Sequence, residues 1–386
     1  MHKIKFYPVG NGDTAQIILD NKKRILLDYR HQSSGERENT AVIDLANSLK
    51  NELKSENIDF FDVVAFTHLD KDHIQGSTDF FELRHAEKYK GKDRIKIKEL
   101  WVPAALILES AAIDEQSDEF IILRQEARYR LKEGFGIKVF SKPDELITWM
   151  DEHDVQMRDE LFVDAGQLVS TFSLDEDQVE FFCHSPFIKH CDENESKKEI
   201  RNRTALIFNV RFKYSNYFYD FLAVGDSEYD VLDDIVSISK YHNNEDRLKW
   251  NLFNLPHHCS YKALAPDGEK GERTTIPSDG VKELLLSGQE NAYMISSSHK
   301  IGSNNEAYEQ IQPPHVQAKN CYVKHLEEVN GRKLLVTMEE SKVANPKPIE
   351  IEISSNGLRY SKVLLAATVS TAASKPVRAG VTFDNV

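Results

Sequence analysis

The sequence predicts a mixed α/β fold, and the order of the elements in its N-terminal part is the main indication. Three strands are expected first, at Lys3–Tyr7, Thr14–Leu19 and Arg24–Tyr29. The next segment, Ala41–Leu53, places its apolar residues on one stripe and predicts an amphipathic helix. The apolar run Phe61–Phe66 lacks glycine and proline, so it predicts a buried strand. This β-β-β-α-β order favours a mixed sheet over a helical bundle.

The rest of the chain continues to alternate between predicted strands and helices. Further strands are expected at Glu99–Pro103, Gly136–Phe140, Gln178–Cys183, Thr204–Phe212, Phe218–Val224, Leu252–Leu255, Ala292–Ser296, Lys333–Met338 and Ile349–Ile353. Further helices are expected at Asp118–Lys132, from Pro143 onward, at Tyr229–Lys240 and near Glu306–Ile311. The span Ala265–Gly280 is rich in glycine, proline and charge, and it predicts a mobile loop.

We expect one domain over residues 1–365, with an insertion at 80–175 and a disordered tail at 366–386. The insertion carries no catalytic pattern, and we expect it to cover or border the active-site face. Segments of this kind often set substrate choice. The tail is rich in small and polar residues and has no periodicity, which is typical of disorder.

Composition excludes several classes of protein. The 386 residues include 49 basic and 63 acidic side chains, for a net charge of −14. This balance argues against a protein that coats nucleic acid with its whole surface. The four cysteines lie far apart, which fits free thiols in a reducing compartment. No apolar run is long enough to span a bilayer, and the N-terminus lacks a signal peptide, so we expect a soluble, cytoplasmic protein.

The segment THLDKDHIQG directly after the buried strand Phe61–Phe66 predicts a metal site. It places four metal-capable side chains within six positions, at His68, Asp70, Asp72 and His73. A strand end is a rigid platform, and the following loop can turn these side chains toward one cation. The alternative is a polar loop with two chance histidines, but such clusters rarely follow a buried strand so closely.

Other strand ends supply further candidate ligands. Asp226 follows the strand Phe218–Val224, with Gly225 allowing a sharp turn, and its carboxylate can bridge two cations. His257 and His258 follow another strand, and His184 ends a third. A dinuclear hydrolytic centre requires such ligands, because one metal lowers the pKa of a bound water while the pair holds the attacking and leaving oxygens.

Five motifs in order resemble the metallo-β-lactamase superfamily, and most closely its ComEC-type branch, which is associated with DNA uptake. They are VGNGDT (Val9–Thr14), HLDKDH (His68–His73), NRTALIF (Asn202–Phe208), LAVGD (Leu222–Asp226) and PHHCS (Pro256–Ser260). The resemblance implies a four-layer αββα sandwich with a helical insertion and a hydrolase with two divalent metal ions. It leaves the insertion and the tail unmatched. Relatives that work in DNA uptake carry a transmembrane channel, which this chain lacks, so transport is not expected.

The resemblance also implies roles for the matched residues. His68 and Asp70 would hold one metal, and Asp72 and His73 the other. Asp226 would bridge the two metals. His257 would complete the set, with His258 as the alternative. An oxygen donor at Asp70, where the wider superfamily has histidine, raises the odds of Mn²⁺ relative to an all-imidazole site, although Zn²⁺ stays open.

Several nearby residues depart from the pattern or lack a fixed role. His184 either binds metal or caps a strand end, and Cys259 replaces the usual glycine as an extra ligand or, as we favour, as a buried apolar filler. His299 is a candidate for contact with substrate phosphate, and it joins Asp72 as a candidate catalytic residue. Lys262 and Ser260 also lie close to the histidines. Asp13 and Asp28 are expected to brace loops rather than to bind metal.

The favoured function is a phosphodiesterase, with a nuclease as the leading form, in which a metal-bound hydroxide attacks phosphorus. The basic stretch Arg84–Lys98 either flanks a cleft for a polyanionic substrate or forms a solvated loop. One alternative is a small-molecule hydrolase that acts on a cyclic nucleotide, a lactone or a thioester. Another is a partner-dependent effector subunit that docks through the insertion or the tail.

Overall fold

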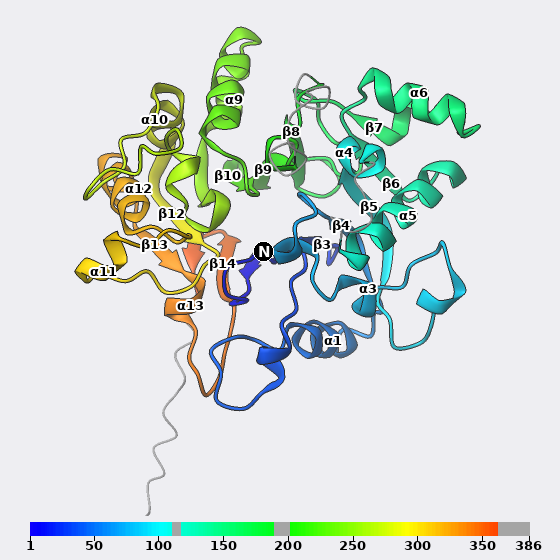
Figure 1. The fold of residues 1–386 in the computed structure, drawn as a ribbon, viewed down its shortest axis with the longest axis horizontal. Coiled ribbons are helices and arrows are strands. Elements are labelled where there is room, and N and C mark those ends of the chain that lie inside the picture. Colours follow the sequence, from blue (N-terminus) through cyan, green and yellow to red (C-terminus); the bar gives the residue numbers. More distant parts are fainter. Residues whose placement is uncertain (110–116, 189–200, 362–386) are drawn as a thin grey trace, which may run out of the picture.

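The computed structural model describes residues 1–109, 117–188 and 201–361. These residues form two mixed β-sheets with helices on both sides (Figure 1). The strands of the first sheet are β1 (His2–Phe6), β2 (Ala15–Ile18), β3 (Arg24–Leu27), β4 (Phe60–Ala65), β5 (Lys96–Pro103), β6 (Ile137–Phe140), β7 (Phe162–Val163), β14 (Ile349–Ser354) and β15 (Gly357–Tyr360). Those of the second are β8 (Val179–Ser185), β9 (Ile207–Tyr214), β10 (Tyr217–Val224), β11 (Trp250–Asn254), β12 (Gly288–Ser296) and β13 (Lys333–Val336).

The helices divide into two groups along the chain. The first group is α1 (Leu45–Ser55), α2 (Lys71–Ile74), α3 (Ser77–Phe80), α4 (Ala104–Leu108), α5 (Asp118–Glu133) and α6 (Asp144–Glu152). The second is α9 (Tyr229–Tyr241), α10 (Asp279–Leu286), α11 (Asn305–Tyr308), α12 (Val316–Glu328) and α13 (Thr337–Glu340). Figure 1 shows α1, α3, α5 and α6 on one side of the molecule and α9, α10 and α12 on the other. In the described residues, no helix is both long and apolar enough to cross a membrane.

Three separate apolar cores define four layers. The middle core packs the two sheets against each other, as where Trp101 of β5 contacts Phe181 of β8 and Phe208 of β9. A second core joins the outer face of the first sheet to α1, α5 and α6. A third joins the outer face of the second sheet to α9, α10 and α12. The predicted αββα sandwich is therefore confirmed.

Alternation along single strands explains this arrangement. In β4 and the residue after it, Val63 and Ala65 belong to the middle core, whereas Val64 and Phe66 belong to the core on the outer face. All four are fully buried. Successive side chains of a strand point to opposite faces of the sheet, and apolar layers cover both faces here. The absence of polar residues at these positions is the reason that the sequence indicated a buried strand here.

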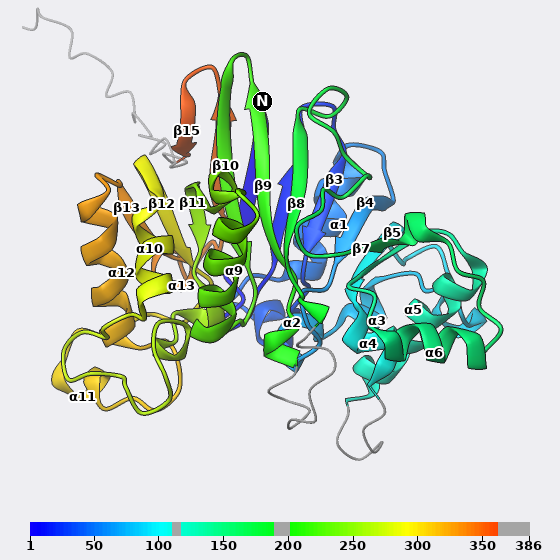
Figure 2. The same ribbon diagram turned by 90° about the horizontal axis from the view of Figure 1, so that it is seen from above.

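Strand direction decides where loops gather. The first sheet has the order β15-β14-β1-β2-β3-β4-β5-β6-β7, and β3 to β7 run parallel. The second has the order β13-β12-β11-β10-β9-β8, with β10 to β13 parallel. The parallel strands of each sheet therefore end at one edge. Figure 2 shows α2 at this end of the strands, opposite the turn between β9 and β10.

Segment 80–175 contributes more to the sheet than we expected. Its strands β5, β6 and β7 extend the first sheet, and α4, α5 and α6 cover them. The predicted loop at Ala265–Gly280 ends where α10 begins, at Asp279, and the predicted strand Lys333–Met338 ends at Val336. Helix α12 and strand β15 were not expected from the sequence. The predicted tail at 366–386 lies outside the described residues.

Candidate metal centre

Side chains from five chain segments meet at the edge where the parallel strands end. His73 lies on α2, just after β4, while Asp226 follows β10 and His258 follows β11. Because β2 runs antiparallel to β3, the loop between β1 and β2 lies at the same edge and delivers Asp13. Asp28 comes directly after β3. The topology thus brings together residues that are far apart in the sequence.

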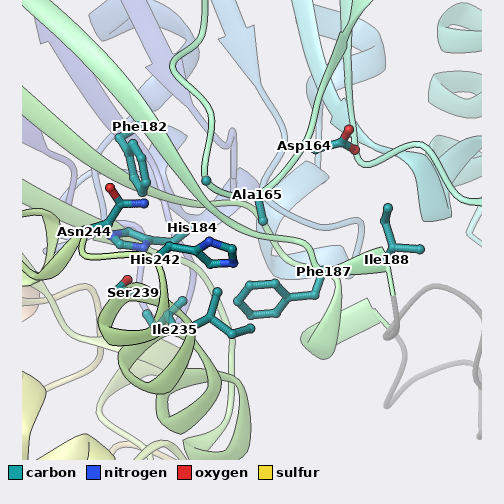
Figure 3. A pocket seen from close by; sticks show the side chains of 12 residues that line it. Asp164, Ala165, Phe182, His184, Phe187, Ile188, Ile235, Ser239, His242 and Asn244 are labelled. Atoms are coloured by element: carbon teal, nitrogen blue, oxygen red, sulfur yellow. The ribbon is translucent and has the colours of Figure 1, made fainter.

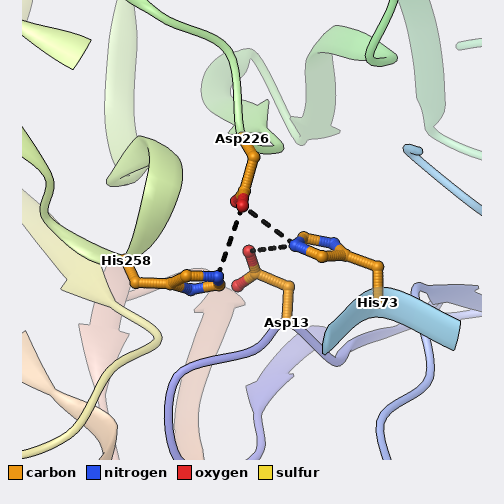
Figure 4. Close-up of side chains that lie close together, drawn as sticks. All are labelled: Asp13, His73, Asp226 and His258. Carbon is orange, nitrogen blue, oxygen red and sulfur yellow. Dashed lines mark ion pairs between the residues drawn. The ribbon is translucent and has the colours of Figure 1, made fainter. Parts of the chain in front are cut away.

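Four buried side chains form a compact cluster (Figure 4). One potential ligand atom from each of Asp13, His73, Asp226 and His258 lies within 4.8 Å of the others. Nε2 of His73 is 3.2 Å from Oδ1 of Asp226, and Nε2 of His258 is 3.4 Å from Oδ2 of the same carboxylate. Asp226 therefore lies between the two imidazoles. Two nitrogen and two carboxylate donors suit Zn²⁺ or Mn²⁺.

Unsatisfied polar atoms indicate that this cluster fits a cation. Among the described residues, no hydrogen bond reaches Nε2 of His68 or of His73, Oδ2 of Asp13, or Oδ1 of Asp226, although all four atoms are buried. Leaving such atoms unpaired costs free energy, and sites where it happens call for an explanation. A divalent cation among them would satisfy these donors together.

Asp28 fixes the orientation of His73. Its Oδ2 is 2.7 Å from Nδ1 of His73, and it accepts hydrogen bonds from the backbone and the hydroxyl of Thr67 at 2.7 and 2.6 Å. With Nδ1 held in this way, Nε2 of His73 is the nitrogen that faces Asp226. A carboxylate on the far nitrogen of a histidine is the usual device for presenting the near nitrogen to a metal.

Substitution of Asp28 by Asn is therefore expected to weaken metal binding without removing a ligand. Partners of metal-binding histidines typically contribute about 10–100-fold to metal affinity or activity, and we expect a loss of that size. Isothermal titration of the metal-stripped protein with Mn²⁺ or Zn²⁺ measures it. The exposed Asp175 supplies a control in Asp175→Asn. Unchanged affinity in the Asp28 variant would show that His73 needs no such support.

The backbone of the histidine pair is strained in the structure. His257, His258 and Cys259 have φ angles of 48°, 54° and 65°, a run in the left-handed region that side chains other than glycine rarely adopt. Such strain persists where the surroundings impose it, and it concentrates at functional sites. The conformation places Nδ1 of His258 3.0 Å from the carbonyl of Ser297, so Nε2 faces Asp226 and Asp72.

Charges inside the cluster balance one another. Burial alone would lower the pKa of both histidines, but Asp226 and Asp28 raise that of His73 well above its ordinary value. Asp226 and Asp72 likewise raise the pKa of His258 to about 10. The two histidines hold the pKa of Asp226 well below its usual range, although burial opposes them. A divalent cation at this place would balance the same carboxylates.

The other predicted ligands lie around this cluster. Nε2 of His68 is 3.8 Å and Nε2 of His257 is 3.9 Å from Oδ2 of Asp226, so both rings face this carboxylate. Oδ2 of Asp72 is 3.1 Å from Nε2 of His258. Asp70 instead forms an ion pair with Arg201, at 2.9 Å. The structure therefore brings most of the predicted set together around Asp226 and directs Asp70 toward an arginine.

His184 lies in a different environment (Figure 3). Together with His242 and Phe182 it lines a cavity of about 500 Å³, and none of the four cluster residues lines that cavity. Its Nε2 is 3.0 Å from the backbone carbonyl of Arg247, and burial lowers its pKa to about 4. This placement matches the strand-end role more closely than the role of a ligand in the cluster.

The remaining candidates near the histidines have structural partners. Cys259 is buried in the outer core, where burial raises the pKa of its thiol, which fits the expected apolar filler. The hydroxyl of Ser260 accepts a hydrogen bond from the backbone of Lys262, and Nζ of Lys262 lies 3.1 Å from Asp267. His299 is exposed, and its backbone N–H donates to Asn11 at 2.8 Å.

The basic stretch Arg84–Lys98 does not lie beside the cluster. Lys96 and Lys98 pair with Asp59 and Asp62, at 2.7 and 2.8 Å, where β4 and β5 begin. The cluster gathers where β4 ends, at the opposite edge of the sheet. Arg94 donates to the carbonyl of Phe81 at 2.9 Å. This stretch therefore forms local contacts, which agrees better with a solvated loop than with one side of a cleft for a polyanionic substrate.

Two residues of this region were not assigned a role in chemistry from the sequence. Asp13 was expected to brace a loop, yet its carboxylate belongs to the cluster. Arg30, two residues after Asp28, has Asp72 and Asp13 as its neighbouring charges. The signal for Arg30 was its position directly after the expected strand Arg24–Tyr29, and the signal for Asp13 was its position directly before the expected strand Thr14–Leu19, next to Gly12. Both signals are weak without the partner strands.

No protein-family model and no curated protein matches the chain. Among solved structures it resembles a diphosphatase of the PhnP family, at 11% identity and a TM-score of 0.32, over 82% of this chain and 95% of the other. It also resembles the metallo-β-lactamase GOB-18 from Elizabethkingia meningoseptica, at 12% identity and 0.31, over 84% and 88%. A third is the long form of RNase Z from yeast, at 9% and 0.35, over 90% of this chain and 41% of the other. These TM-scores are low, so the function is argued from the site itself.

Proposed function

We propose that the protein is a metal-dependent hydrolase of the metallo-β-lactamase type that cleaves phosphodiester bonds. The observation that carries the proposal is the convergence on one point of buried ligand atoms of Asp13, His73 and Asp226 that lack a hydrogen bond among the described residues, with His258 beside them. The five motifs in matching order support the same assignment. A divalent cation bound there would supply a Lewis acid and lower the pKa of water.

The chain's own residues would prepare the site for such a cation. Asp28 holds His73 with Nε2 directed inward, and the carbonyl of Ser297 does the same for His258. Asp226 offers one carboxylate oxygen to each imidazole, which is the arrangement of a bridging ligand. Since burial of these groups excludes water from the ligand set, their charges act at low dielectric.

His299 supplies a titratable group at the rim of the site. Partial burial lowers the pKa of its imidazole, and the neighbouring cations Arg30 and His258 lower it further. The ring packs against Gly10, where a Cβ atom would lie 3.0 Å from Cε1 of His299. We propose that His299 contacts substrate phosphate rather than binding metal, in line with the expectation of Asp72 and His299 as the catalytic pair.

A cleavage assay tests the proposal. Metal-stripped protein is given Mn²⁺ or Zn²⁺ and offered linear and circular DNA, single-stranded DNA, RNA, a cyclic nucleotide and a lactone. We expect metal-dependent cleavage of a phosphodiester that falls at least about 100-fold in Asp72→Asn, since Asp72 contacts His258. The exposed Asp79 gives the control Asp79→Asn. Hydrolysis of the lactone with no cleavage of any diester would contradict the proposal.

A further inference from the structure

Arg30 is a half-buried cation at the rim of the cluster without a partner of its own. Its backbone N–H donates to the hydroxyl of Thr14 at 2.9 Å, which fixes residue 30 against the loop between β1 and β2. Within the described residues, Nε and Nη1 of its guanidinium are buried and have no hydrogen-bond partner. A guanidinium in this state is poised to accept an anionic group.

The glycines of the VGNGDT motif make room for this arginine. A Cβ atom at Gly12 would lie 2.2 Å from Cδ and 2.7 Å from Nη1 of Arg30, so any other residue would displace the side chain. A Cβ at Gly10, whose φ is +79°, would lie 3.0 Å from Cε1 of His299. Arg30 and His299 therefore pack against the same turn, and the turn lacks side chains at the two positions that they approach.

Two other cations near the site, Arg201 and Lys262, are already paired. Arg201 forms ion pairs with Asp70 and Glu109, and Lys262 forms one with Asp267. The charges that face Arg30 are the carboxylates of Asp72 and Asp13 and the imidazole of His299. If Asp13 and Asp72 held a divalent cation, their negative charge would be shared with it, and the guanidinium would be able to pair with a further anion. The guanidinium would then face the place where a substrate would approach that cation.

We propose that Arg30, with His299 across the Gly10–Gly12 turn, binds a phosphate group of the substrate. The planar guanidinium matches two oxygens of a phosphate, and the adjacent imidazole lies at the same rim. This inference rests on the proposed function and deepens it, because it gives the site a preference for anionic phosphoesters over neutral lactones. Arg30 is thus a substrate-binding residue outside the ligand set.

Phosphate binding tests the inference on the full chain. Inorganic phosphate is titrated by calorimetry into the protein with and without bound Mn²⁺, for the wild type, Arg30→Gln and Arg30→Lys. We expect Arg30→Gln to weaken phosphate binding to the Mn²⁺-loaded protein about 10-fold or more, as for loss of a charged hydrogen-bonding partner. Arg30→Lys keeps the positive charge but lacks the planar guanidinium that can donate to two phosphate oxygens, so we expect an intermediate loss of phosphate affinity. The exposed Arg37 supplies the control Arg37→Gln.

The metal titration separates failure of this inference from failure of the proposed function. We expect Arg30→Gln to bind Mn²⁺ as tightly as the wild type or more tightly, because a positive charge beside Asp13 and Asp72 is removed. Normal Mn²⁺ binding with unchanged phosphate affinity in both Arg30 variants would overturn the inference and leave the hydrolase proposal standing. A wild type that binds no Mn²⁺ would overturn both.

Discussion

Replacement of Asp226 by Asn is expected to abolish hydrolysis and most of the metal affinity. Its two carboxylate oxygens lie 3.2 to 3.9 Å from the imidazoles of four histidines, namely His73, His258, His68 and His257. Asp226 is therefore the neighbour that all four candidate histidine ligands have in common. Loss of a mere partner of a ligand costs about 10–100-fold, and we expect more than about 100-fold here because the bridging group itself loses its charge. Metal titration and the cleavage assay measure the two losses.

Thermal unfolding gives this prediction a readout that does not depend on catalysis. A ligand that binds only the folded state stabilises it by about 2.7 kcal/mol when present at 100 times its dissociation constant. We expect the wild type to gain stability on addition of Mn²⁺ and Asp226→Asn to gain almost none. The matched variant Asp175→Asn, in the exposed loop before β8, should behave like the wild type. An equal gain in the Asp226 variant would place the metal elsewhere.

Substitution of Glu126 by Gln is expected to have the largest effect on stability. Glu126 lies on α5 and is fully buried, and its Oε1 forms an ion pair with the buried Arg130 at 2.6 Å. Its Oε2 accepts from the backbone N–H groups of Arg84 and His85, at 2.7 and 3.0 Å. Removing one member of a buried ion pair leaves the other uncompensated, at a cost of about 3–5 kcal/mol. Chemical denaturation measures the loss.

The same carboxylate makes stability depend on pH in the acid range. Burial alone would raise the pKa of Glu126, but His85 and Arg130 lower it from an ordinary value of 4.5 to about 2. Its contribution is therefore complete above pH 4.5 and is lost as the pH falls toward 2. Glu126→Gln should flatten this part of the stability curve, whereas Glu133→Gln, at an exposed position of the same helix, should not. A wild-type-like acid limb in Glu126→Gln would contradict this account.

Local patterns were sufficient to predict a mixed α/β fold and to single out candidate ligands at strand ends, whereas the four-layer sandwich was expected from the family resemblance. Within Phe61–Phe66, the positions that pack into the two cores are all apolar. The strand and the polar loop after it could therefore be recognised together. The same holds for Asp226, which follows the apolar end of β10. In both cases, the apolar strand and the candidate ligands that follow it lie within one short stretch of sequence.

Features that depend on distant partners were not predictable. Asp13 joins the cluster only because β1, β2 and β3 pair in a particular order, which places its loop beside α2. The choice between His257 and His258 depends on three consecutive left-handed residues, which the residue types themselves disfavour. Asp70 meets an arginine 131 positions away. Tertiary context decides each of these cases.

The extent of the first sheet within segment 80–175 was only partly predictable for a related reason. Strand β6 corresponds to the expected strand Gly136–Phe140, whereas β7 has only two residues, too short for a periodic signal, and joins the sheet through parallel pairing with β6. The sequence therefore indicated helices such as α5 more clearly than the edge that they cover. Short buried strands gain their stability from neighbours that a local pattern does not contain.

Anomalous diffraction from crystals of the protein grown with Mn²⁺ tests the central claim most directly. The ligand set predicts an anomalous peak among Asp13, His73, Asp226 and His258, with a second ion, if present, on the His68 and His257 side of Asp226. Crystals of Asp226→Asn should lack the peak. A well-ordered wild-type site whose four side chains surround no anomalous scatterer would contradict the claim that this cluster is a metal centre.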